Sequence, residues 1–163
     1  MKHGRWPTVL VMCCVLFFAC DAPADSSAED DVMVAALEAE IRLALKDATP
    51  RQTPVVCVEI DPGEAPQSPS KEFVARLKHL APHVVRSGEC EVDETGVFDR
   101  DTRQPALKVT AGPVDWLRAD EAEIAVTLTH STTDSIPHRY RVAREGGRWT
   151  CLGQVMKMDM DPA

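Results

Sequence analysis

Two pairs of histidines in this chain are candidate metal ligands. His79 and His83 are four residues apart, the spacing that places two zinc ligands on one helical face. Pro82 lies between them and ends the helix, so that shared face is lost. His130 and His138 flank a loop and could approach each other across a hairpin. Zinc needs further ligands, and we interpret both pairs as surface histidines.

Three methionines alternate near the C-terminus, at Met156, Met158 and Met160. On a strand they would share one face, where their thioethers could bind Cu(I) in an exported protein. A buried strand face is the interpretation we favour, because methionine fills irregular space in a core.

The segment 91–103 is rich in carboxylates, the ligands that calcium prefers. It lacks the EF-hand pattern, and Arg100 and Arg103 lie among the acids, which favours a solvated loop. The chain also lacks the GxSxG, P-loop, GxGxxG, HExxH and CxxC motifs. We therefore predict no catalytic residue, no metal and no cofactor.

The N-terminus has the organisation of an export signal. Lys2 and Arg5 precede an uncharged apolar run over 9–19, which is too short to span a bilayer as a helix. The run ends in Ala19-Cys20, which resembles the bacterial lipobox, in which a small residue precedes a cysteine that is lipidated. The resemblance implies a lipid on Cys20 and anchorage to a bacterial membrane, facing the periplasm or the exterior.

Two features weigh against the lipobox. Phe17 stands where the lipobox usually has leucine, and Ala22-Pro23-Ala24 is an A-x-A site. Cleavage at that site would release a soluble periplasmic or secreted protein. Both interpretations predict export.

Export to an oxidising compartment predicts a disulfide. Cys57 and Cys90 each lie in a strand-like segment, and we predict that they pair; pairing of Cys57 with Cys151 stays open. In the favoured pairing Cys151 is a buried free thiol.

Composition excludes one class of partner. The chain has a net charge of −8, and all 26 acidic residues follow the apolar run. Such a chain is not expected to bind nucleic acid or anionic lipid head groups.

The elements that must position these residues follow from hydrophobic periodicity. Val34, Leu37 and Ile41 recur at helical spacing and predict a helix over 31–47. Ser68-Pro69 is typical of the start of a second helix, which Pro82 ends.

A strand is predicted at 54–60 between the helices, and strand-like segments fill the rest of the chain after the second helix. Gly112-Pro113 predicts a break or bulge, and Gly146-Gly147 predicts a two-residue hairpin. We expect a signal peptide at 1–19, a flexible tether at 20–30 and a single α+β domain at 31–163.

The segment 105–154 contains Gly112-Pro113-Val114-Asp115-Trp116 and ends in Gly147-Arg148-Trp149. In these motifs it resembles small bacterial lipoprotein domains of the cystatin-like or nuclear-transport-factor-2-like type. The resemblance implies two N-terminal helices packed on a curved antiparallel sheet of about four to five strands. It implies nothing about activity, because this fold carries unrelated functions.

The prediction is thus a lipid-anchored envelope protein with a binding or structural role and an unknown partner. The alternative is a small-molecule binder or a small enzyme that uses the concave face of the sheet. A pocket of several hundred cubic ångströms lined by polar groups favours that alternative.

Overall fold

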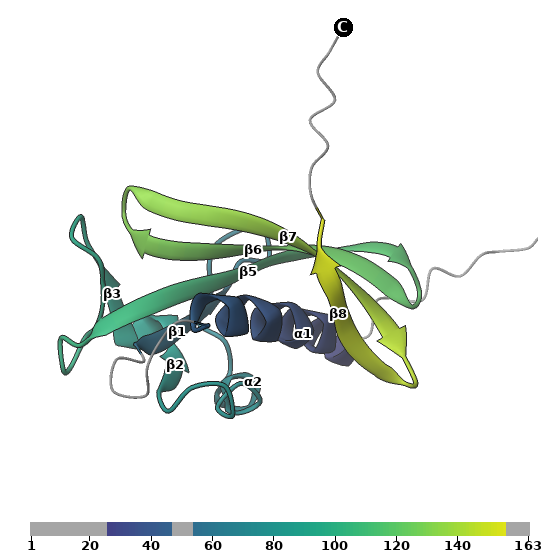
Figure 1. Ribbon diagram of the computed structural model, residues 1–163, viewed down its shortest axis with the longest axis horizontal. Helices are drawn as coiled ribbons and strands as arrows, with labels where there is room; N and C mark the ends of the chain where they lie inside the picture. Colours follow the sequence, from purple (N-terminus) through teal and green to yellow (C-terminus); the bar gives the residue numbers. More distant parts are fainter. Residues whose placement is uncertain (1–25, 47–53, 156–163) are drawn as a thin grey trace, which may run out of the picture.

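A computed structural model describes residues 26–46 and 54–155. One long helix, α1 (Ser26–Ala44), lies across the concave side of a curled β-sheet (Figure 1). The sheet consists of eight strands, six of which lie side by side in the order β2-β1-β5-β6-β7-β8. These six are β1 (Val55–Ile60), β2 (Val84–Arg86), β5 (Pro105–Arg118), β6 (Glu121–Ser131), β7 (Asp134–Glu145) and β8 (Arg148–Gln154).

The last four strands form an antiparallel meander joined by short turns. The predicted hairpin at Gly146-Gly147 is confirmed; both glycines have positive φ, of 59° and 85°, as a two-residue turn of this type requires. The predicted irregularity at Gly112-Pro113 is confirmed too, as a shift in register between β5 and β6. A side chain at Gly112 would approach the Ala125 carbonyl oxygen to 3.1 Å, so glycine permits the close contact there.

The first half of the sheet differs from expectation. β1 runs parallel to both of its neighbours, β2 and β5, so the sheet is mixed. A parallel strand is covered on both faces and reads as a continuous apolar run, and Val55–Val58 is such a run. The predicted antiparallel sheet of four to five strands is therefore wrong.

The second predicted helix is also wrong in extent. α2 covers only Lys71–Ala75, and its N-cap is Ser70, whose hydroxyl accepts a hydrogen bond from the Phe73 N–H at 3.0 Å. Beyond Ala75 the backbone tightens into i→i+3 hydrogen bonds as far as Leu80. With one long helix on a mixed sheet, the expectation of a cystatin-like or nuclear-transport-factor-2-like fold does not hold.

The helix α1 begins at Ser26, earlier than the apolar pattern indicated, with Glu29 in its first turn where an acid favours a helix start. The remainder of the expected tether and the whole signal segment lie outside the described residues.

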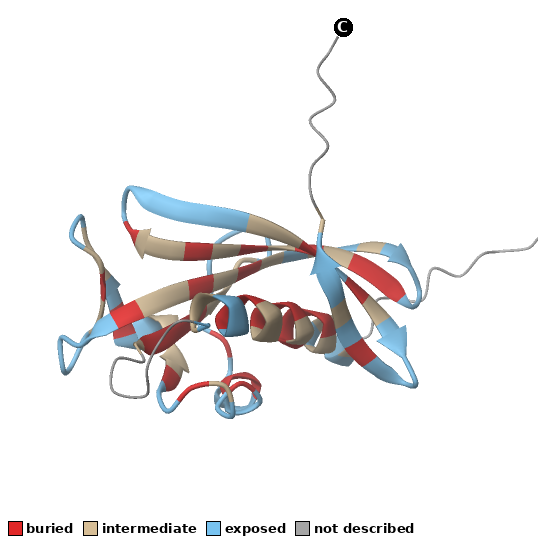
Figure 2. Cartoon of the chain, viewed as in Figure 1, coloured by how far each residue is buried: buried red, intermediate tan, exposed pale blue. Residues whose placement is uncertain are grey.

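The main core lies between α1 and the sheet, as the buried segments in Figure 2 show. Leu37 and Ile41 of α1 pack with Ile124, Val126 and other inward residues of the meander. The aliphatic side chains therefore fill the concave face of the sheet and leave α1 as its cover.

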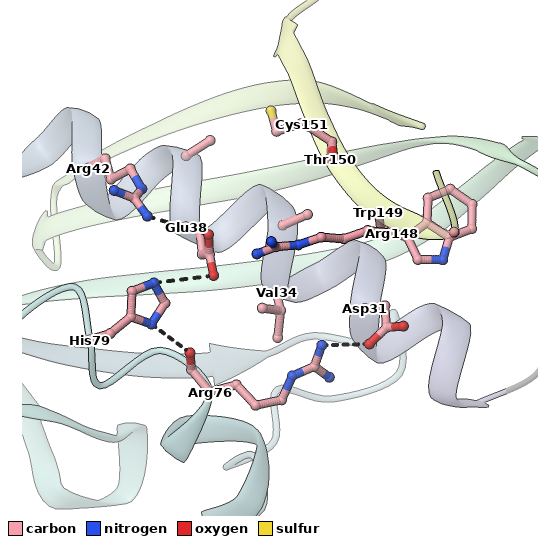
Figure 3. Close-up of a pocket in the computed structure, with 13 residues that line it drawn as sticks. Asp31, Val34, Glu38, Arg42, Arg76, His79, Arg148, Trp149, Thr150 and Cys151 are labelled. Carbon is pink, nitrogen blue, oxygen red and sulfur yellow. Dashed lines mark hydrogen bonds and ion pairs between the residues drawn. The ribbon is translucent and has the colours of Figure 1, made fainter. Parts of the chain in front are cut away.

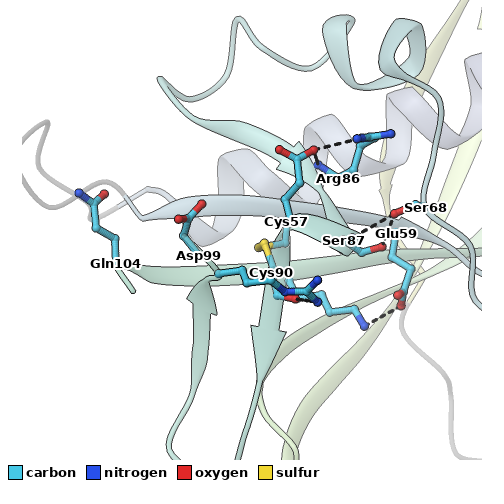
Figure 4. Close-up of a disulfide and its surroundings, with 12 residues drawn as sticks. Cys57, Glu59, Ser68, Arg86, Ser87, Cys90, Asp99 and Gln104 are labelled. Carbon is cyan, nitrogen blue, oxygen red and sulfur yellow. Dashed lines mark hydrogen bonds and ion pairs between the residues drawn. A yellow bond between two sulfur atoms is a disulfide. The ribbon is translucent and has the colours of Figure 1, made fainter. Parts of the chain in front are cut away.

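A smaller cluster lies on the other side of β1 and contains the disulfide (Figure 4). Cys57 of β1 is bonded to Cys90 of β3 (Cys90–Val92), with the two Cα atoms 6.3 Å apart. β3 pairs with β4 (Val97–Asp99), and β4 pairs with the start of β5. The expected pairing is present, and Cys151 is a free thiol.

Candidate functional site

A groove runs between α1, the turn after α2 and the beginning of β8 (Figure 3). Its volume is about 820 Å³, within the range of roughly 300–1,000 Å³ that ligand sites occupy. Two of its lining residues, Val34 and Trp149, also belong to the core, so the groove borders the core along one side of α1. The concave face of the sheet, where the sequence placed the alternative site, is covered by α1.

The helix supplies one wall because residues three and four apart share a face. Asp31, Glu38 and Arg42 present polar groups along this wall, and Val34 lies between them. The opposite wall is the start of β8, from Arg148 to Cys151. Arg76 and His79 close the groove from the turn after α2.

Most charged groups in the groove are paired. Arg76 binds Asp31 at 2.5 Å, and Arg42 lies 3.7 Å from Glu38. The Nε2 atom of His79 is 3.5 Å from Glu38, and its Nδ1 atom donates to the Arg76 carbonyl oxygen at 3.0 Å. These contacts hold the turn after α2 against α1.

Arg148 is different, because its guanidinium makes no hydrogen bond or ion pair with any residue in 26–46 or 54–155. The groove thus has three arginines against two carboxylates, Asp31 and Glu38. In a chain of net charge −8, this is a locally positive surface with one unpaired cation.

Trp149 packs the β8 wall against the core. It is 8% exposed, and its ring meets that of Trp116 edge to face, with centroids 5.4 Å apart. Cys151 follows on the same strand, half-buried, and burial raises the pKa of its thiol. The thiol is therefore a poor nucleophile at neutral pH.

The inner face of α1 carries a buried carboxylate that the sequence analysis did not single out. The Oε2 atom of Glu40 accepts hydrogen bonds from Tyr140 Oη at 2.7 Å and His138 Nδ1 at 2.8 Å. Its Oε1 atom has no hydrogen-bond partner in the described part of the chain, although the side chain is fully buried. Gln154 donates to Tyr140 Oη at 3.2 Å.

This cluster of Glu40, His138, Tyr140 and Gln154 fastens α1 to β7 and β8. Burial and, secondarily, the bond to Glu40 raise the pKa of Tyr140, so the phenol stays protonated and donates. The signal was present in the sequence, because Glu40 falls on the apolar stripe between Leu37 and Ile41.

The candidate metal ligands are not brought together. His138 pairs across the sheet with Val126, which is four residues, or about 13 Å, along β6 from His130. His79 bonds to Glu38 and Arg76, and His83 follows in the loop before β2. The described ranges contain no group of three or more His, Cys, Asp or Glu side chains placed to hold a metal.

The remaining candidates divide between turns and undescribed residues. Asp93 and Asp99 accept hydrogen bonds from Thr95 and Thr102, respectively, which lower the pKa of each acid. They close the tight turns on either side of β4, so the predicted solvated loop over 91–103 is wrong, since it contains the end of β3 and all of β4. The three alternating methionines at 156–160 and Cys20 lie outside the described residues.

No protein-family model, curated protein or solved structure matches this chain. None of the described helices is both long enough and apolar enough to cross a bilayer.

Proposed function

We propose that this chain is an exported envelope protein, anchored to a bacterial membrane through a lipid on Cys20, and that it acts as a binding module. The support for export and anchorage is the basic start, the short apolar run and Ala19-Cys20. These signals lie in the sequence and do not depend on the fold of the domain. In this proposal the folded domain that follows them recognises the partner.

The ligand site we propose is the groove between α1 and β8. The observation that carries it is Arg148, an exposed and unpaired cation at the wall of a groove large enough for a ligand. Unpaired arginine is suited to bind a carboxylate or phosphate in bidentate fashion. The concave face of the sheet is filled by α1, so we do not place the site there.

A photo-crosslinking amino acid in place of Thr150 tests the groove. Thr150 is exposed at the β8 wall; Thr132, an exposed threonine in the β6–β7 turn, is the matched control. We expect adducts, identified by mass spectrometry after irradiation of intact cells, from position 150 and not from position 132. Arg148→Glu should remove them. Equal labelling at both positions, or none at 150, would refute the groove as a ligand site.

The anchor has its own test. Cells that produce the full chain are labelled with radioactive palmitate, and wild type is compared with Cys20→Ser. We expect label on the wild type alone. Equal label on both proteins would contradict lipidation of Cys20 and favour cleavage at Ala22-Pro23-Ala24, with release of a soluble protein.

A further inference from the structure

The β8 wall of the groove is a free edge of the sheet. Among the described residues, β8 is the last strand in the order and pairs with β7 alone. In an antiparallel pair, alternate residues direct their N–H and C=O groups toward the partner strand and away from it. Some N–H and C=O groups of β8 therefore point outward from the edge of the sheet, away from β7.

The register identifies which groups these are. Glu145 and Arg148 flank the two-residue turn, so they form a hydrogen-bonded pair, and the next pair, Arg144 and Trp149, does not. The N–H of Arg144 confirms this parity, because it donates to the Asp120 carbonyl oxygen at 2.8 Å, away from β8. The N–H and C=O groups of Trp149 and Cys151 are thus directed to the open edge.

Up to Cys151 this edge has few of the devices that usually block strand addition; a bulge at Leu152 then interrupts the pairing of β8 with β7. β8 contains no proline and no lysine, and its single charge is Arg148. Leu152 is 52% exposed beside it. The regular stretch before the bulge, Arg148 to Cys151, includes Trp149 and Cys151, whose backbone groups can pair with an added strand.

The charge next to the edge selects the kind of strand. Arg148 lies on the edge strand itself, and Arg42 and Arg76 line the same groove from the other side. The carboxylates that line the groove, Asp31 and Glu38, are already engaged by Arg76 and Arg42. Glu145 lies opposite Arg148 in the register of β7 and β8 but makes no ion pair with it among the described residues. An incoming strand with acidic side chains would satisfy Arg148, whereas a basic strand would be repelled.

We propose that an extended, acidic segment of a partner protein binds in the groove by pairing with β8 as an additional strand. This proposal rests on the function proposed above and names the class of its ligand. Backbone bonds to Trp149 and Cys151 provide the pairing. Arg148 provides the preference for acidic side chains.

The first measurement is binding of a fluorescein-labelled octapeptide of alternating Glu and Val to the full chain, purified in mild detergent, by fluorescence anisotropy. An alternating Lys and Val octapeptide should bind at least about tenfold more weakly. Arg148→Glu should weaken binding of the acidic peptide by about tenfold. Lys71→Glu is the matched control, since Lys71 is exposed, lies outside the groove and undergoes the same change of charge.

The second measurement distinguishes strand addition from simple attraction of charges. Amide hydrogen exchange, followed by NMR, should slow at Trp149 and Cys151 when the acidic peptide is added. The amides of Arg148 and Thr150, which face β7, should change little. Binding without protection at Trp149 and Cys151 would overturn strand addition.

The outcomes separate this proposal from the one it rests on. Failure of the peptide to bind, with groove-specific adducts still formed at Thr150, overturns the acidic strand and leaves the groove as a ligand site. Absence of both peptide binding and adducts overturns the two together. Preference for the Lys and Val peptide overturns the assignment of an acidic partner.

Discussion

The buried carboxylate of Glu40 gives the sharpest prediction about stability, through a double-mutant cycle with Tyr140. Tyr140→Phe removes one of the two hydrogen bonds to Glu40, whose Oε1 atom already lacks a partner among the described residues. Hydrogen bonds to a charged group contribute about 1.5–3 kcal/mol, so we expect a loss of about 2 kcal/mol in the free energy of unfolding.

The second arm of the cycle replaces the carboxylate with an apolar side chain of similar size. Glu40→Met removes the unpartnered Oε1 atom along with the charge, and Tyr140 keeps its bond to Gln154. The hydroxyl hydrogen of Tyr140 loses its acceptor, however, because Gln154 donates to that oxygen, so we expect Glu40→Met to cost about 1–3 kcal/mol. In the Glu40→Met background, Tyr140→Phe should cost less than about 1 kcal/mol.

Urea unfolding of the four proteins, monitored by circular dichroism at a constant m-value, measures the cycle. We expect a coupling energy between Glu40 and Tyr140 of about 1–2 kcal/mol. Additivity within about 0.5 kcal/mol would refute the reasoning, since the two side chains would then act independently.

Three further predictions concern other groups. Cys57→Ala/Cys90→Ala opens a bridge across 33 residues and should lower the free energy of unfolding by about 4 kcal/mol; a loss below about 1 kcal/mol in urea would contradict this. Hydrogen bonding, chiefly from Arg141, lowers the pKa of Glu123 below 4.5. The stability that ionised Glu123 contributes is therefore present at pH values above 4.5 and is lost as the pH falls through the lowered pKa. Glu123→Gln should therefore destabilise the protein at about pH 7 but not at about pH 2, and an equal effect at both would exclude this origin. Burial should make Cys151 react with iodoacetamide at least about tenfold more slowly in the native chain than in urea, and equal rates would argue against it.

Local patterns predicted the parts of the fold that depend on neighbouring residues. The spacing of Val34, Leu37 and Ile41 marks α1 because burial of one helical face follows the helical period. Gly146-Gly147 marks its hairpin because few other residues adopt the positive φ values that the turn requires.

Arrangements that depend on distant segments could not be predicted in this way. The direction of β1 relative to β5 is decided by tertiary packing, and its continuous apolar run, Val55–Val58, was the available signal for burial on both faces. α2 was predicted too long because Phe73 and Leu77 are buried at helical spacing even though the backbone tightens between them.

The groove was hidden from the sequence for a related reason. Its walls come from segments around 31–42, 76–79 and 147–151, and no motif joins them. That Arg148 is unpaired while Arg76 and Arg42 are paired depends on where each guanidinium lies after folding. Glu40 is the exception, since a carboxylate on an apolar helical stripe can be recognised directly.

The parallel pairing of β1 also has a consequence for the speed of folding. The strands β5 to β8 are consecutive hairpins, whereas β1 must find β5 across the chain, with Cys57 opposite Lys108. Contacts between distant residues form slowly, because the chain loses the entropy of loop closure before these contacts can stabilise it. We therefore expect the meander to assemble first and the docking of β1 to limit the rate. The disulfide to β3, which β4 joins to β5, then keeps β1 close to its partner and shortens that search.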